Sequence, residues 1–152
     1  MCTSFMSELL TATHNFGTAP TRGASTADTF KAALYLATAT VNASTTAYSV
    51  TNEVSGAGYT AGGVAVTNAT APTSTNASAT AGVAYWTPSA SITYSSVTLS
   101  TAFDSVLIYN NTQSNKAVSV HTFGSQTVTS GTFTLTMPSN TTTAALLRLA
   151  TT

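Results

Sequence analysis

Apolar and polar residues alternate along the chain between residues 28 and 37. One side of the alternation holds Phe30, Ala32, Leu34 and Leu36, and the other holds Lys31, Ala33, Tyr35 and Ala37. Successive side chains of a β-strand point to opposite faces of its sheet, so a period of two predicts a strand here, with two unlike faces.

Short runs of similar character recur through the rest of the chain. They are rich in β-branched and aromatic residues, which suit a pleated surface, and they cover residues 64–67, 83–86, 92–99, 106–109, 117–123, 133–137 and 145–150. Turn-forming groups separate them, at Pro72, Pro88, Asn110-Asn111, Gly124-Ser125, Ser130-Gly131 and Pro138. Seven or eight short strands with almost no helix predict an all-β fold, an antiparallel β-sandwich of jelly-roll-like or Ig-like type over residues 28–152.

Three segments do not follow this simple pattern. Residues 42–63 contain clustered glycines and should form a long ordered loop anchored by Tyr48, Val54 and Tyr59. Residues 69–81 form a Thr/Ala/Ser/Asn tract that is either a loop or an exposed edge ribbon, and the loop is favoured. Residues 144–150 have a composition that also suits a helix, but the alternation around Leu147 and Leu149 favours a final strand.

The N-terminal segment has a different periodicity. Cys2, Phe5, Met6 and Leu9 have the i, i+3, i+4, i+7 spacing of one apolar helical stripe. A helix this short is marginal alone in water, so the stripe must dock either on its own domain or on a neighbouring subunit. We therefore expect residues 1–27 to be an anchoring segment, a short N-terminal helix or arm, with these four side chains as its interface.

Charge is scarce throughout the chain and narrows the choice of function. The only charged residues are Lys31, Lys116, Arg22, Arg148, Glu8, Glu53, Asp28 and Asp104, and the net charge is zero. Acid–base and metal chemistry need ionisable groups held together, and nucleic acids and anionic membranes need clustered cations, so we expect neither an enzyme nor those partners. A chain without net charge also lacks the repulsion that keeps copies apart, which favours a homo-oligomer.

Few residues remain as candidates for chemistry. His14 and His121 are the only histidines and have no neighbouring metal ligands in sequence, so we expect no metal site, no catalytic residues and no bound cofactor. Tyr85, Trp86 and Tyr94 are an aromatic group that is either a stacking platform for sugars or, as favoured here, a core or subunit-interface cluster.

Several blocks resemble a family of small structural proteins of tailed bacteriophages. They are Thr29-Phe-Lys-Ala-Ala-Leu-Tyr, Thr51-Asn-Glu-Val-Ser-Gly-Ala-Gly-Tyr-Thr-Ala-Gly-Gly, Val106-Leu-Ile-Tyr-Asn, Asn115-Lys-Ala-Val-Ser-Val-His-Thr-Phe-Gly, Gly131-Thr-Phe-Thr-Leu-Thr-Met-Pro and Leu146-Leu-Arg-Leu-Ala. The block that begins at Thr51 is the most specific of them. The order of the blocks spans nearly the whole chain.

This resemblance implies a virion component without known catalytic residues, assembled in the host cytoplasm. The leading hypothesis is a capsid decoration or cement protein that binds the major capsid protein lattice or other virion proteins, as a homo-oligomer with a trimer favoured. The alternative is a tail, neck or fibre-base subunit. A third possibility is a carbohydrate-binding adhesin domain that uses Tyr85, Trp86 and Tyr94.

Overall fold

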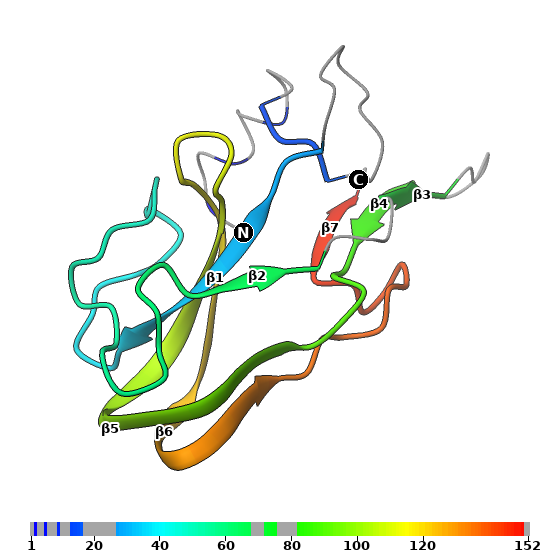
Figure 1. Cartoon of the computed structure of the whole chain (residues 1–152). Coiled ribbons are helices and arrows are strands. Elements are labelled where there is room, and N and C mark those ends of the chain that lie inside the picture. The colour runs from blue at the N-terminus through cyan, green and yellow to red at the C-terminus, as the bar shows by residue number, and fades with distance from the viewer. Residues whose placement is uncertain are drawn as a thin grey trace.

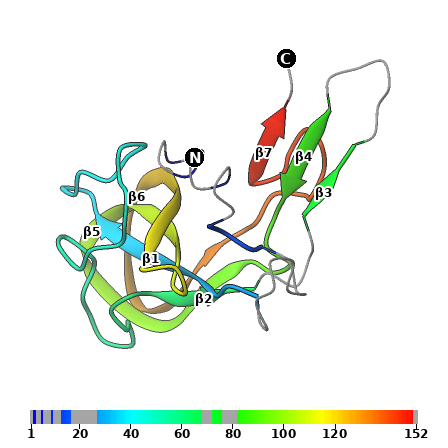
Figure 2. The same cartoon turned by 90° about the horizontal axis from the view of Figure 1, so that it is seen from above.

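The computed structural model describes residues 2, 5, 9, 13–16, 27–67, 72–75 and 82–150 of the chain. Seven strands make up its regular structure: β1 (Phe30–Leu36), β2 (Val64–Val66), β3 (Thr73–Ser74), β4 (Val83–Trp86), β5 (Ile92–Asn110), β6 (Lys116–Leu135) and β7 (Leu147–Ala150). They form two antiparallel sheets, one of order β2-β1-β5-β6 and a smaller one of order β3-β4-β7 (Figures 1 and 2). The predicted all-β, sandwich-like fold is confirmed. In the part of the chain that is described, no helix is long and apolar enough to cross a membrane.

Strands β5 and β6 form a long bent hairpin that dominates the larger sheet (Figure 1). The bend is sharp, because the rings of Phe123 and Phe133 lie on one strand and yet have centroids 5.3 Å apart. Register shifts accompany the bend between Tyr94 and Ser105, and Ser130 on the facing strand has a φ of 46°. Bulges of this kind bend a strand without ending it.

The bend corrects two of the sequence predictions. Gly124-Ser125 and Ser130-Gly131 were expected to be turns between strands, but both pairs lie inside β6. The predicted strands 92–99 and 106–109 are likewise parts of the single strand β5. Within the favoured loop 69–81, Thr73–Ser74 is an edge strand, β3, so the ribbon alternative holds for those two residues.

Other predictions are confirmed by the strand bounds. Strands β1, β2, β4 and β7 lie where alternation or β-branched runs predicted them. However, β1 does not have two unlike faces, since Ala33 and Tyr35 are buried like Phe30 and Leu34. One reason is that the ordered loop before β2 covers it: Val54 N–H donates to Leu34 O at 3.0 Å, and Tyr35 Oη–H donates to Ser49 O.

The N-terminal segment contributes to the core between the two sheets. Phe16 stacks on Phe30 of β1 with ring centroids 4.5 Å apart, and it lies 4.9 Å from Trp86 of β4. Phe30 and Trp86 themselves are 6.3 Å apart. Phe16 is therefore a wedge that joins the small sheet to the large one.

Candidate functional site

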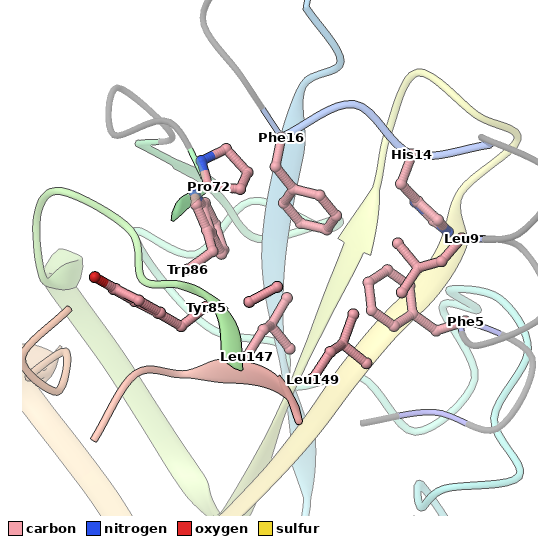
Figure 3. Close-up of a pocket in the computed structure, with 10 residues that line it drawn as sticks. Phe5, Leu9, His14, Phe16, Pro72, Tyr85, Trp86, Leu147 and Leu149 are labelled. Carbon is pink, nitrogen blue, oxygen red and sulfur yellow. The ribbon is translucent and has the colours of Figure 1, made fainter. Parts of the chain in front are cut away.

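An open apolar groove lies between the N-terminal segment and the small sheet (Figure 3). Its volume is about 240 Å³. Its described lining consists of Phe5, Leu9, His14, Phe16, Pro72, Ala84, Tyr85, Trp86, Leu147 and Leu149. The groove thus brings together two sets of residues that the sequence singled out separately.

The small sheet supplies one wall of the groove through the alternation of its strands. Trp86 pairs with Leu147 and Ala84 pairs with Leu149, so these four side chains share one face of the sheet. Tyr85 alternates with them and points away from the groove in Figure 3. Leu149 is 42 % exposed, so the wall stays open to solvent at its outer end.

The opposite wall comes from the N-terminal segment, which is held by backbone and aromatic contacts. Cys2 N–H donates to Val118 O at 3.0 Å, and Val118 is the residue that the bulge of β6 leaves unpaired with β5. Phe5 packs against His14 at 4.8 Å and edge-on against Phe16 at 5.8 Å. These contacts bury Cys2 and Phe5 within their own chain.

A buried polar cluster fixes His14 at the end of the groove. Asn110 Oδ1 accepts the backbone N–H groups of Thr112 and Gln113, both at 3.0 Å, which sets the orientation of the amide. Asn110 Nδ2 therefore donates, to Asp28 Oδ2 at 2.8 Å and to His14 Nδ1 at 3.1 Å. Since Nδ1 accepts, the His14 proton is on Nε2 and the ring is neutral in this arrangement.

A second polar cluster anchors the loop that precedes β2. Glu53 is buried, and its carboxylate accepts Tyr48 Oη–H at 2.7 Å, Tyr59 Oη–H at 2.7 Å and Gly62 N–H at 2.8 Å. Burial, together with the negative charge of Glu53, raises the pKa of Tyr59 and of Tyr94, and raises that of Tyr109 to about 12. These phenols stay protonated and act as hydrogen-bond donors, not as acids near neutral pH.

Ser119 and His121 form a hydroxyl–imidazole pair on β6. Their side chains are 2.9 Å apart, and burial lowers the pKa of His121. Ser119 is fully buried, so its hydroxyl is closed to a substrate from solvent. The pair is a contact between two side chains of the same strand.

The predicted interface residues are placed as follows. Cys2, Phe5 and Leu9 pack on their own domain, the first of the two docking alternatives, while Met6 and most of the predicted helix lie outside the described residues. Trp86 packs with Phe16 and Phe30.

The predicted aromatic group is divided between the two sheets. Tyr94 of β5 packs with Tyr59 of the loop before β2 and with Phe133 of β6. Trp86 instead packs against Phe16. Tyr85 lies on the other face of β4 from Trp86. Tyr85, Trp86 and Tyr94 are thus not a single platform.

The two polar clusters were not predicted. The His14–Asn110 contact spans 96 residues, and no local spacing could have indicated it. Glu53 carried a usable signal, because it is the one acid in a glycine- and tyrosine-rich loop.

Comparison with models of protein families, with curated proteins and with solved structures finds no match to this chain.

Proposed function

We propose that this chain is a structural subunit of a bacteriophage virion, and specifically a capsid decoration protein that binds the lattice of the major capsid protein. The observation that carries the proposal is the scarcity of surface charge. The described residues include six charged side chains, Asp28, Lys31, Glu53, Asp104, Lys116 and Arg148. Asp28 and Glu53 are buried in the two polar clusters. Of the other four, Arg148 is exposed and the remaining three are partly buried.

Such a surface suits a subunit that is packed in many copies. Contacts between charged surfaces require ions to lose water, and that cost can exceed the attraction gained. A surface of hydroxyl and small apolar groups avoids most of that cost. Many weak contacts on a repeating lattice then add up through avidity.

The block that carries most of the resemblance to phage structural proteins has a structural role in this chain. Within that block Glu53 accepts hydrogen bonds from Tyr59 and Gly62, and Tyr59 Oη accepts Leu34 N–H of β1 at 3.0 Å. Gly63 has a φ of 71°, and a Cβ there would overlap Ala32 O of β1. The block therefore consists of residues that hold this loop on β1.

The N-terminal segment would have to change its position in order to attach the protein to a capsid, which the sequence did not indicate. Cys2 and Phe5 are buried, so they can attach the protein to a capsid only if the segment leaves its groove. Deleting residues 1–16 removes the Phe16 wedge. We therefore expect this deletion to destabilise the fold as well as to abolish incorporation.

Leu9 offers a cleaner test of attachment. It is only partly buried at the groove, so Leu9→Ser should leave the core intact. Reduced occupancy of Leu9→Ser on particles, with an unchanged melting temperature, is the result expected of an anchor. Normal occupancy would remove Leu9 from the attachment surface.

Copy number in purified particles tests the proposal itself. Quantitative mass spectrometry of the virion should give hundreds of copies, in proportion to the major capsid protein. About 3 to 12 copies, the size of a closed ring, would instead assign the chain to the tail, neck or fibre base. Absence from the particle would overturn both assignments.

The carbohydrate-binding alternative is not proposed, because Trp86 and Tyr94 are 3 % and 1 % exposed and cannot stack on a sugar.

A further inference from the structure

The outer edge of β6 is covered at its beginning and open further on. Ala117 N–H donates to Thr46 O at 2.9 Å, and Val118 O accepts Cys2 N–H, so neighbouring segments close the edge there. β6 is the last strand of its sheet and continues to Leu135. No described segment pairs with the outer side of its final part, which we name the β6 arm (residues 131–135), seen in orange at the lower edge of Figure 1.

The β6 arm follows the bulge at Ser130 but lacks two other features with which proteins protect an exposed edge, charged residues and proline. Edge strands are normally shielded by charged residues, by proline or by very short length. Residues 117–135 contain no charged residue and no proline. Every second residue of such a strand directs its N–H and C=O outward, so the arm offers unpaired backbone groups to another strand.

The inner face of the β6 arm carries an aromatic side chain that is only partly buried. Phe133 packs edge-on against Phe103 at 5.0 Å and lies 6.1 Å from Tyr94. It is classed as partly buried, whereas Phe103 and Tyr94 are fully buried. A strand added beside the arm would cover the remaining surface of Phe133.

We propose that the β6 arm pairs with the β6 arm of a second copy, antiparallel and centred on Phe133. In this register Phe133 faces Phe133 of the other copy, Thr132 faces Thr134, and Gly131 faces Leu135. Aromatic pairs and Thr–Thr pairs are among the cross-strand contacts that stabilise antiparallel strands. The arm is thus complementary to itself, and since it carries no charge, two copies meet without repulsion.

The resulting interface is two-fold symmetric and closes on itself. It joins two large sheets into one continuous sheet. The basic unit under this proposal is a dimer, whereas the sequence analysis favoured a trimer. The inference stands independently of the proposed virion role, because it depends only on the edge and its side chains.

The register can be tested with charge substitutions at the two exposed threonines. T132K/T134K places lysine opposite lysine in both symmetric pairs, whereas T132K/T134E places lysine opposite glutamate. Thr122 and Thr127 are also exposed on β6 but lie outside the arm, so T122K/T127K is the matched control for added charge. Far-ultraviolet circular dichroism and thermal melts confirm that each variant folds.

Analytical ultracentrifugation of the full chain over a range of concentrations gives the dissociation constant. We expect the wild-type chain to be a dimer, and we expect T132K/T134K to raise its dissociation constant about tenfold. The dissociation constant of T132K/T134E should be near or below the wild-type value, and that of T122K/T127K should be little changed. A wild-type monomer at the highest attainable concentration, or a trimer, would overturn the proposal. A dimer equally insensitive to both charge pairs, or one weakened equally by the control, would overturn the assignment to this arm.

Discussion

Replacement of Glu53 by alanine should loosen the loop that precedes β2 and destabilise the whole domain. Glu53 Oε1 accepts from Tyr59 and Gly62, and Oε2 accepts from Tyr48, at 2.7 to 2.8 Å. Without the carboxylate, the Tyr59 hydroxyl proton and the Gly62 N–H have no acceptor, at about 1–3 kcal/mol for each buried donor. Tyr48 is only partly buried and can turn to water.

The two orphaned donors together cost about 2–6 kcal/mol, and relief from burying a carboxylate offsets part of this, so we expect a loss of about 3 kcal/mol. Urea unfolding at neutral pH measures it. Tyr48→Phe removes one of the same bonds without leaving a buried donor, and should lose about 1 kcal/mol. If Glu53→Ala loses no more than Tyr48→Phe, the cluster does not stabilise the fold and our account of the loop is wrong.

Three further outcomes follow from the geometry. Tyrosines of the unfolded chain ionise near pH 10, whereas burial raises the pKa of Tyr59 and Tyr94 above that value and raises the pKa of Tyr109 to about 12. The unfolded state therefore loses these protons at a lower pH than the folded state. The free energy of unfolding should fall above pH 10 by about 4 kcal/mol per pH unit for the three tyrosines together. Urea titrations at pH 10 and pH 11 measure the free energy of unfolding, and tyrosinate absorbance reports ionisation. An unchanged free energy of unfolding between these two pH values would contradict this account. Gly63→Ala should cost at least about 3 kcal/mol, because its φ of 71° and the overlap with Ala32 O act together, whereas Gly124→Ala, which meets no atom within 4 Å, should change stability by less than about 1 kcal/mol. Asn110→Ala should lose about 2–4 kcal/mol in a thermal melt, since it removes one hydrogen-bond donor to Asp28 and to His14 and the side-chain acceptor of two backbone N–H groups. A loss no larger than that caused by Asn111→Ala, at the exposed neighbouring residue, would argue against the cluster.

Strands with local signals were predictable, and those shaped by tertiary packing were not. β1 and β4 follow alternation and β-branched composition, which are properties of a few adjacent residues. β5 and β6 were each predicted as two shorter strands, and β6 was divided because Gly124-Ser125 and Ser130-Gly131 read as turns. In the structure Ser130 takes a positive φ within a bulge, and pairing with β5 continues beyond it. A local turn signal cannot distinguish a bulge from the end of a strand.

The same distinction applies to the candidate site. Phe5 and Leu9 were identified by spacing, and they do use their apolar sides for docking. Trp86 and Tyr94 were grouped because they are close in sequence, but β4 and β5 belong to different sheets. Asp28 and Asn110 were missed as a pair because 82 residues separate them, and only the folded topology brings them together.

The Phe16 wedge also has a consequence for the order of events during folding. Phe16 is made before one of its partners, Trp86, which emerges 70 residues later, and the β7 strand that pairs with Trp86 emerges later still. The core between the sheets therefore closes only when segments that are far apart in sequence meet. Such non-local topologies fold slowly, typically in milliseconds to seconds. During that time Phe16 stays exposed, so we expect the yield of native protein to depend on chaperones or on low expression temperature more than the yield of a local hairpin fold does.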